Sequence, residues 1–529
     1  MPPIRVSIKH SGKTIPDLEL DPEKPGAVFK QTIYEKTGVP LDRMKVIVKW
    51  GMLKDDTDWA KVGVKEGQTF TVIGAAGELP KPPSDAIVFL EDMDDQQLAS
   101  VLNIPVGLQN LGNTCYMNAT IQALRSIPEL QEGLKSYTPS PINPAQLSGD
   151  VNGALTTALG SLYQDMSRTG EPFPPLHFLQ LLRQVNPQFA EMSRSGHGYA
   201  QQDADECWSQ IITSIGNGGL GRDIGGWTNH FMAGEMETTL TCDDAPGEPP
   251  SVTREKIMKL QCNISMSTNY MHTGIKDSLD QKIVKNSPSL GTEATYTQRS
   301  RVSRLPTNLT VQMVRFYWRR DINKKAKIMR KVKFPFTFDV VAEGIVTDEL
   351  QKKLAPVNGR LREIERERME RQKVRRRVKI AKKEKDDDVQ MADTTTATPA
   401  PTEAAAPVPG DLPDEKEARA KEVSELMALV DPTLTEDLGA NVTGMYELAA
   451  IVTHKGASAD GGHYIAWVKQ SELQPGSGLS DGGDGAGDDW LKFDDDKVSV
   501  VKQDKIVQLD GGGEDSSAYI LLYRSKSLE

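Results

Sequence analysis

One cysteine is placed where a thiol can do chemistry, at the predicted start of a helix. Cys115 lies in the stretch GLQNLGNTCYMNATIQALRS (residues 107–126) and is one of four cysteines in the 529-residue chain. Asn113 and Thr114, which precede it, are residue types that favour the position before a helix. Unpaired backbone N–H groups at such a start favour an anion and lower the pKa of a thiol, so we expect Cys115 to be a reactive thiolate. The buried stripe of this helix is predicted to contain Met117, Ile121 and Leu124.

A thiol hydrolase also needs a base, usually a histidine, and a third group that orients the base. His463 follows two glycines in ADGGHYIAWV (residues 459–468) and begins a predicted strand. Asp494 directly follows the predicted strand WLKF (residues 490–493), where it can accept the proton on the far imidazole nitrogen. A purely structural histidine is the alternative for His463 alone. Together with Cys115 and Asp494 the pattern favours a papain-like arrangement, in which a cysteine at a helix start faces a histidine and an acid on a sheet.

Helices and then strands are predicted around these residues, from Ile104 to about Arg524. The predicted helices cover residues 115–126, 153–166, 176–184 and 201–215. The predicted strands cover residues 309–318, 331–340, 446–455, 463–469, 490–493 and 518–524. This order is typical of an α+β fold, in which helices pack on one side of a sheet.

The first 75 residues have the pattern of a separate small domain: strand, strand, helix, strand and strand. This pattern resembles the β-grasp fold of ubiquitin. The segment PLDRMKVIVKWGMLKDD (residues 40–56) is similar to the middle of ubiquitin, and Ile47 falls where ubiquitin has its outward-facing recognition isoleucine. The stretch VIGAAGE (residues 72–78) lacks the Gly-Gly end that conjugation requires. The resemblance therefore predicts a ubiquitin-like docking domain over residues 1–75 with Ile47 as its partner-binding residue; the alternative is an ordinary exposed apolar side chain.

Two further segments have the composition of a linker and of an insertion. Residues 76–103 carry Pro and Gly early and acids later, as a linker does. The stretch RLREIERERMERQKVRRRVKIAKKEK (residues 360–385) has dense charge of both signs, and a run rich in Ala, Thr and Pro follows it. We predict a solvated charged helix and a disordered tether within residues 355–420. Nucleic-acid binding by the basic stretch is the alternative to a solvated helix face.

Composition argues against several classes of protein. Lys and Arg number 63 and Asp and Glu 74, a net charge of −11, which is unlike a nucleic-acid binder. No apolar run approaches the ~20 residues of a membrane span, and residues 1–13 do not have the pattern of a secretory signal. The four cysteines form no CxxC pair, so we expect no structural zinc site and no other cofactor. Their number fits a reducing compartment, and we expect the protein in the cytoplasm and nucleus.

Several motifs together resemble those of the ubiquitin-specific proteases. GLQNLGNTCYMNA (residues 107–119) resembles their cysteine box, and YELAAIVTHKGASADGGHYIAWV (residues 446–468) resembles their histidine box. QQDADE (residues 201–206) and WLKFDDDKVS (residues 490–499) also match, in the expected order. The resemblance covers nearly all of residues 104–526 except the charged insertion. It implies a helical thumb, a β-sheet palm and β-strand fingers, and the preceding ubiquitin-like domain is similar to that of the proteasome-associated members.

The resemblance also assigns roles to individual residues. Cys115 would be the nucleophile, His463 the general base and Asp494 the orienting acid. Asn110 would donate its side-chain amide to the oxyanion beside the Cys115 backbone N–H. The residues expected to hold the substrate's extended tail are Gln202, Asp203, Gly462 and Tyr464. For the first two of these, a helix start with an acid at its positive end is an equally good explanation.

The activity implied by the resemblance is hydrolysis of the isopeptide bond at the C-terminal glycine of ubiquitin. The expected partners are ubiquitin, its conjugates and the regulatory particle of the 26S proteasome, which would bind the ubiquitin-like domain and activate the enzyme. Two loops, at residues 319–325 and 456–462, would gate the site. In contrast to many relatives, the fingers, near residues 232–270 and 295–318, have no CxxC pairs and would be held by strand pairing alone.

Other functions remain compatible with the sequence. The first is a catalytically inactive ubiquitin-binding scaffold that regulates the proteasome, although all three triad positions are filled. The second is a protease for a ubiquitin-like modifier. A non-proteolytic regulatory role could also coexist with hydrolysis.

Overall fold

The computed structural model describes residues 3–41, 43–49, 51–57, 59–74, 105–138, 150–193, 198–319, 324–389, 414–456, 461–473 and 489–528. The chain divides into two compact units, Met1–Asp92 and Met93–Glu529. The division falls within residues 76–103, and this segment lies outside the described residues. Each unit is considered by itself.

The N-terminal unit is a five-stranded sheet packed on one main helix. Its strands lie in the order β2-β1-β5-β3-β4, with β1 and β5 parallel and the other pairs antiparallel. Alternate residues of β1, such as Val6 and Ile8, join Phe29 and Ile33 of the helix in the core. This is a β-grasp fold, as expected from the resemblance to ubiquitin. Its elements are β1 Ile4–His10, β2 Lys13–Leu20, α1 Gly26–Thr37, β3 Lys45–Val48, β4 Gly51–Met52, α2 Trp59–Val62 and β5 Thr69–Ile73.

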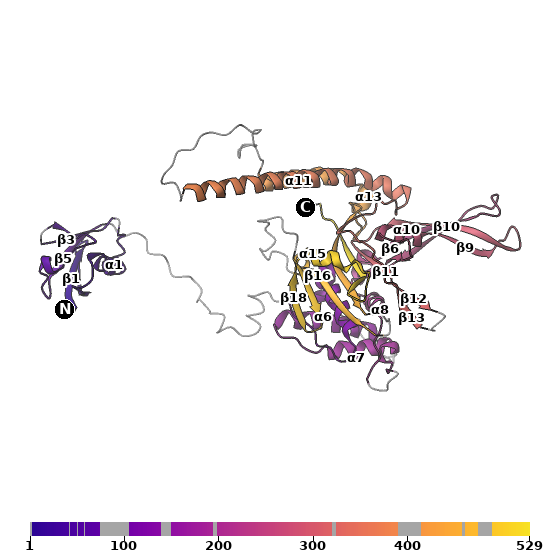
Figure 1. Cartoon of the computed structure of the whole chain (residues 1–529), viewed down its shortest axis with the longest axis horizontal. Helices are drawn as coiled ribbons and strands as arrows, with labels where there is room; N and C mark the ends of the chain where they lie inside the picture. The colour runs from indigo at the N-terminus through magenta and orange to yellow at the C-terminus, as the bar shows by residue number, and fades with distance from the viewer. Residues whose placement is uncertain are drawn as a thin grey trace. The chain divides into compact units, whose positions relative to one another are not determined.

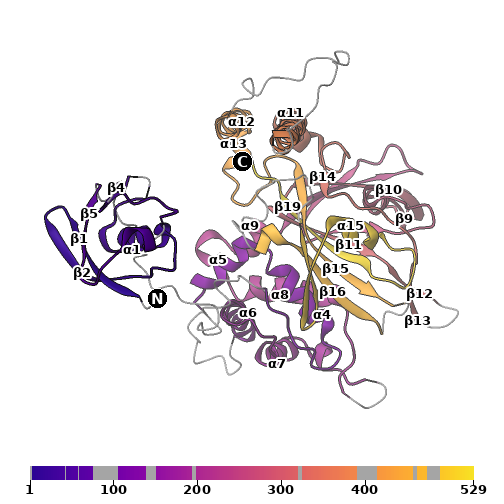
Figure 2. The ribbon, with the colours of Figure 1, turned by 60° about the vertical axis from the view of Figure 1, so that its left-hand side comes forward.

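The larger unit begins with helices that cover one side of a sheet (Figure 1, Figure 2). Helix α4 begins at Cys115, as predicted, but all ten of its residues are buried, not only one stripe. It is surrounded because it packs against both α8 and the sheet, so a polar face is absent. The helices and short 3-10 turns are α4 Cys115–Leu124, α5 Pro128–Ser136, α6 Val151–Arg168, α7 Leu176–Val185, η2 Pro187–Ala190, α8 Ala204–Asn217, η3 Arg222–Ile224 and α9 Trp227–Phe231.

The central sheet has β16 and β15 near its middle, in the order β18-β17-β16-β15-β19-β11-β8, with β14 pairing β15. Both faces are buried: Tyr464 and Ala466 of β16 face the helices, and Ile465 and Trp467 face a second core. The sheet elements are β8 Leu260–Asn263, β11 Asn308–Val314, β14 Thr337–Asp339, β15 Met445–Lys455, β16 His463–Lys469, β17 Trp490–Asp494, β18 Lys497–Val501 and β19 Ser517–Ser525. Short elements beside it are β12 Phe316–Arg319, β13 Lys324–Lys327, α14 Gln470–Leu473, α15 Gln503–Val507 and η4 Gln508–Asp510.

A second sheet projects from this body and corresponds to the predicted fingers (Figure 1). Its order is β7-β6-β10-β9. Strand pairing is not its only support, contrary to expectation, because Cys242, Ala294 and Tyr296 form a small core of their own. The carboxylate of Glu248 accepts hydrogen bonds from the hydroxyls of Tyr296 and Ser287, both at 2.7 Å. The elements are β6 Gly234–Cys242, β7 Ser251–Ile257, α10 Met271–Leu279, β9 Asp280–Asn286 and β10 Glu293–Arg304.

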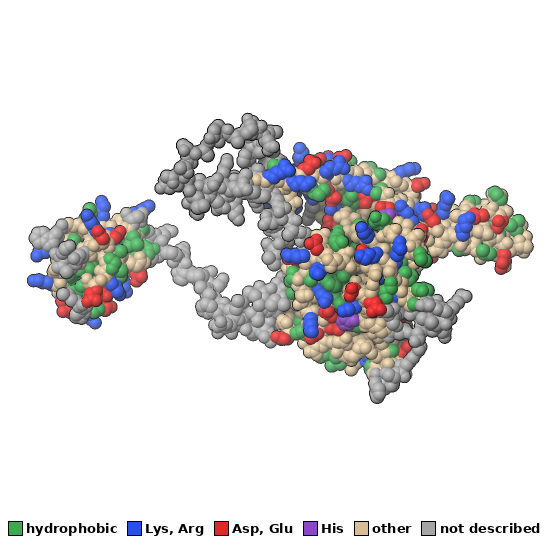
Figure 3. Space-filling model, viewed as in Figure 1, with side chains coloured by type: hydrophobic (Ala, Val, Ile, Leu, Met, Phe, Trp, Pro, Cys, Tyr) green, Lys and Arg blue, Asp and Glu red, His purple; other side chains and the backbone are tan. Residues whose placement is uncertain are grey.

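The charged insertion is only partly a solvated helix. Its first part is buried, because Leu361 and Ile364 pack with Leu426 of α12. Charged side chains of both signs lie on its exposed surface where the side chains are described (Figure 3). The predicted tether falls largely on residues 390–413, outside the described residues. The helices are α11 Asp348–Val389, α12 Glu415–Leu429 and α13 Pro432–Thr435, and no helix in the described ranges is long and apolar enough to cross a membrane.

Candidate active site

Cys115 lies at the junction of the helices and the sheet, with only 2% of its surface exposed. Thr114 precedes the helix, as predicted, but its hydroxyl accepts a hydrogen bond from the N–H of Leu111. The side-chain oxygen of Asn110 accepts from the N–H groups of Gly112 and Thr114 and closes the turn that leads into α4. The local chain therefore fixes the cysteine at the first helical turn.

The prediction that Cys115 is a thiolate is wrong for the free protein. Burial raises the pKa of the Cys115 thiol to about 11, and the charge of Asp495 adds to this. Backbone N–H groups of Tyr464, Tyr116 and Cys115 itself act in the opposite direction but are outweighed. A helix start can lower a thiol pKa only where the sulfur keeps enough solvation, and this sulfur does not. At neutral pH the thiol is protonated.

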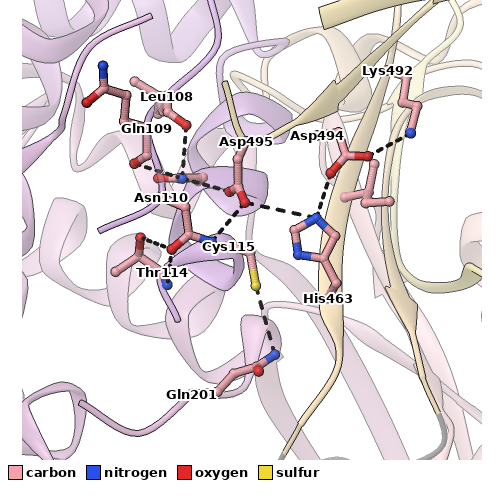
Figure 4. A network of polar contacts seen from close by, with 12 residues as sticks. Leu108, Gln109, Asn110, Thr114, Cys115, Gln201, His463, Lys492, Asp494 and Asp495 are labelled. Atoms are coloured by element: carbon pink, nitrogen blue, oxygen red, sulfur yellow. Dashed lines mark hydrogen bonds and ion pairs between the residues drawn. The ribbon is translucent and has the colours of Figure 1, made fainter. Parts of the chain in front are cut away.

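His463 begins β16 and is directly bonded to the predicted acid. Its Nε2 lies 2.6 Å from Oδ1 of Asp494, and Nζ of Lys492 donates to the other carboxylate oxygen at 2.7 Å. Burial raises the pKa of Asp494, but the hydrogen bonds from Lys492 and His463 outweigh it and hold the pKa below its usual value. Because an ionised carboxylate only accepts, Nε2 carries the proton and Nδ1 is left as the basic nitrogen. Figure 4 shows the ring of His463 beside Cys115, with this nitrogen on the side of the sulfur.

Asp495 lies between Asn110 and His463 (Figure 4), and its Oδ2 is 4.0 Å from Nε2 of His463. Nδ2 of Asn110 donates to Oδ2 of Asp495 at 2.8 Å, so the amide predicted to bind the oxyanion has a protein partner. The same carboxylate accepts from Nδ2 of Asn118 at 2.9 Å. Asp495 has a φ of 52°, a conformation that Asp and Asn adopt more readily than most residues. The run of three acids that begins at Asp494, the last residue of β17, was the signal for this residue, but the sequence does not show which acid faces which partner.

The family model described as "Ubiquitin carboxyl-terminal hydrolase" matches residues 106–523. The chain belongs to this family. The "Ubiquitin carboxyl-terminal hydrolase 6" of Schizosaccharomyces pombe is 41% identical over 535 residues, covering 99% of each chain. The "Ubiquitin carboxyl-terminal hydrolase 6" of Arabidopsis thaliana is 37% identical, covering 98% of each chain. The "Ubiquitin carboxyl-terminal hydrolase 14" of Caenorhabditis elegans is 30% identical, covering 97% of this chain and 91% of the relative.

Among solved structures, the chain is similar to the "SAGA Ubp8/Sgf11/Sus1/Sgf73 DUB module bound to ubiquitin aldehyde", with a TM-score of 0.47 and 17% identity, covering 80% of this chain and 70% of that one. The family match and the near full-length relatives confirm the family, the fold class and the thiol-dependent deubiquitinating activity expected from the sequence.

Two of the residues predicted to hold the substrate's tail, Gln202 and Asp203, follow a glutamine that contacts the cysteine. Gln201, which the sequence did not single out, directs Nε2 at the Cys115 sulfur at 3.9 Å, whereas Gln202 is 7% exposed. Asp203 caps α8, as in the structural alternative, and also accepts from the hydroxyl of Tyr519 at 2.8 Å. Because the two glutamines are adjacent, the sequence alone does not show which of them faces Cys115.

Gly462 and Tyr464 flank His463 but differ in the contacts that they can make. Gly462 has a φ of 142°, and a Cβ there would lie 2.5 Å from Nε2 of His454, so only glycine fits. The ring of Tyr464 is buried at 1% exposure, and its backbone N–H faces the sulfur. Of the two predicted gating loops, residues 320–323 and 457–460 lie outside the described residues. Within the described residues, no group of three or more His, Cys, Asp or Glu could hold a metal ion.

The protonated thiol predicts a steep pH dependence of chemical labelling. We expect the rate at which iodoacetamide alkylates Cys115 in the free protein to rise about tenfold per pH unit between about pH 7 and pH 9, because the thiolate fraction rises with pH below the pKa. Mass spectrometry of the peptide containing Cys115 measures the rate, and Cys115→Ser supplies the background. A rate that is constant below about pH 8 would instead show a thiolate already paired with the imidazolium.

Proposed function

We propose that this chain hydrolyses the isopeptide bond after the C-terminal glycine of ubiquitin, with Cys115 as nucleophile, His463 as base and Asp494 as orienting acid. The observation that carries the proposal is the 2.6 Å bond between His463 and Asp494 on a strand whose next N–H faces the Cys115 sulfur. Family membership supports ubiquitin as the substrate.

Because the thiol is protonated, the base has to act while the sulfur attacks. Nδ1 of His463 accepts the thiol proton as the sulfur bonds to the glycine carbonyl carbon. The C–N bond then breaks, and the imidazolium returns this proton to the departing lysine amine. Water next attacks the thioester while His463 accepts its proton. The C–S bond then breaks, the free carboxyl end of ubiquitin leaves, and the imidazolium returns the proton to the sulfur. Asp494, which is ionised, stabilises the imidazolium in both halves of the reaction.

The oxyanion formed in each half-reaction needs hydrogen-bond donors. The backbone N–H of Cys115, at the helix start, is one candidate. An amide NH₂ has two hydrogens, so Asn110 can keep its bond to Asp495 and direct the second toward the oxyanion. The substrate's two terminal glycines would pass beside Gly462, and we assign the tail contact first expected at Gln202 to Gln201.

We further propose that the N-terminal unit docks on the regulatory particle of the 26S proteasome and so activates the enzyme in the cytoplasm and nucleus. Ile47 is 44% exposed and pairs across the sheet with Met52, which is 61% exposed. Ile73, 52% exposed, lies on the neighbouring strand β5. Three exposed apolar side chains on adjoining strands make a surface suited to a protein partner.

Replacement of the nucleophile tests the hydrolase assignment. We expect Cys115→Ala to abolish release of a fluorophore from the C-terminus of ubiquitin, and His463→Ala to lower kcat at least 10³-fold, because the base contributes to both half-reactions. The matched control is Cys242→Ala, a buried cysteine in the small core of the second sheet. Turnover by Cys115→Ala at the native rate would rule out this mechanism.

Replacement of Ile47 tests the docking surface. We expect Ile47→Arg to weaken binding to purified proteasomes at least tenfold, because a charge at the centre of an apolar contact is desolvated without a partner. Val28→Arg is the control, since Val28 is similarly exposed, at 43%, but lies on α1. Equal binding by both variants would show that another surface docks.

A further inference from the structure

Two cations are buried at the base of the β12–β13 hairpin, and neither is among the residues assigned to catalysis. Arg315 is 1% exposed and Lys327 is 7% exposed. In the described part of the chain, neither forms an ion pair with a carboxylate. Long charged side chains are almost never this buried unless their charge is compensated, so the groups that surround them require an explanation.

The ammonium of Lys327 is held by backbone carbonyls of the histidine-bearing strand pair. Its Nζ donates to the carbonyl of His454 at 2.8 Å and to that of Gly456 at 3.2 Å. Burial and the charge of Arg315 lower the pKa of Lys327 to about 8, with Asp515 and Glu514 acting in the opposite direction. Lys327 therefore binds the backbone at the C-terminal end of β15, on the side where the hairpin lies.

Arg315 fixes the segment that lies beside the same turn. Its guanidinium donates to the carbonyls of Ala518, Arg330 and Asp510 at 2.7–2.9 Å. The chain between Asp510 and Ala518 includes the carbonyl of Glu514, which accepts from the N–H of Gly456 at 2.7 Å. The turn at Gly456 is thus held from two directions, by Lys327 and by the segment that Arg315 anchors.

The catalytic histidine depends on this turn because it lies at the end of its strand. The ladder between β15 and β16 ends with Lys455 opposite His463. The ladder between β16 and β17 begins only at Ala466. Among the described strand pairs, Lys455 is therefore the one partner of His463, and it lies between the two residues whose carbonyls Lys327 holds.

A neighbouring histidine does not replace this anchor. The side chain of His454 is fully buried, and neither ring nitrogen has a hydrogen-bond partner among the described residues. Burial lowers its pKa to about 3, so the ring is neutral at physiological pH. Its ring contacts Phe316 and Tyr464 edge to face, so the hydrogen bonds of His454 are those of its backbone. Its carbonyl accepts from Lys327 at 2.8 Å and, at the longer distance of 3.4 Å, from the hydroxyl of Ser517.

We infer that Lys327 is a positioning residue, whose hydrogen bonds to the carbonyls of His454 and Gly456 hold the end of β15 and thereby place the His463 imidazole against Cys115. The part of this inference that concerns catalysis rests on the proposed function. The anchoring itself does not. A base displaced by about 1 Å typically costs on the order of 10²-fold in rate.

The test compares Lys327→Met, which keeps the length of the side chain but removes its donors, with Lys331→Met. Lys331 follows the same hairpin and is 72% exposed, so it is the matched control. With a fluorogenic ubiquitin amide as substrate, we expect Lys327→Met to lower kcat about 30- to 100-fold with KM within threefold. Hydrogen-exchange mass spectrometry should show at least tenfold faster exchange over residues 450–456 and 461–466, and no change in Lys331→Met.

A guanidinium can donate to both carbonyls, so Lys327→Arg should retain kcat within about fivefold of wild type with native exchange at β15 and β16. This variant also decides the matter if Lys327→Met does not fold. Native kcat and exchange in Lys327→Met, or a kcat as low in Lys327→Arg as in Lys327→Met despite native exchange, would overturn the inference. If wild-type protein does not cleave the substrate, the proposed function fails, while the exchange comparison still tests the anchoring.

Discussion

The active site depends on one carboxylate that joins the helical half of the hydrolase to its sheet. Asp495 accepts from Asn118 on α4 and from Asn110 in the turn before it, which precede it in the sequence by 377 and 385 positions. Its backbone carbonyl also accepts from the N–H of Leu108 at 3.0 Å. Helix α4 is buried on every side, so apolar packing alone would fix its rotation weakly. Directional bonds to a largely buried charge, each contributing about 1.5–3 kcal/mol, set which side of the helix faces β16.

Burial of Cys115 fixes the position of its sulfur but disfavours the reactive thiolate, so other groups at the site must compensate. The sulfur belongs to the main hydrophobic core, which secures its position but raises its pKa. An unionised thiol is a weak nucleophile, so the chemistry requires a base already oriented by an ionised carboxylate. The His463–Asp494 pair provides this, and the end of β15 supports the strand that carries the histidine. Rigidity at the site therefore comes from backbone and side-chain hydrogen bonds that surround a buried sulfur.

Local pattern predicted the elements well and their environment less well. The alternation in β1 and the motif around Cys115 identified the two units, because both depend on neighbours in sequence. The strand predicted over 331–340 is only Thr337–Asp339, since Pro335 lacks the N–H that a strand ladder needs. The pKa of Cys115 and the hydrogen bonds of Asp495 and Gln201 depend on groups distant in sequence, and no periodicity encodes them. The buried part of α11 was missed for the same reason: α12, which covers it, lies beyond residues 390–413.

The most direct test of the central claim uses ubiquitin whose C-terminal glycine carries an electrophilic alkyne in place of the carboxylate. After reaction and digestion, mass spectrometry locates the sulfur that has been modified. The account predicts one adduct, on Cys115, because within the described residues that sulfur is the one beside an imidazole bonded to a carboxylate. A folded protein that forms no adduct, or one modified at Cys207, Cys242 or Cys262 instead, would contradict it.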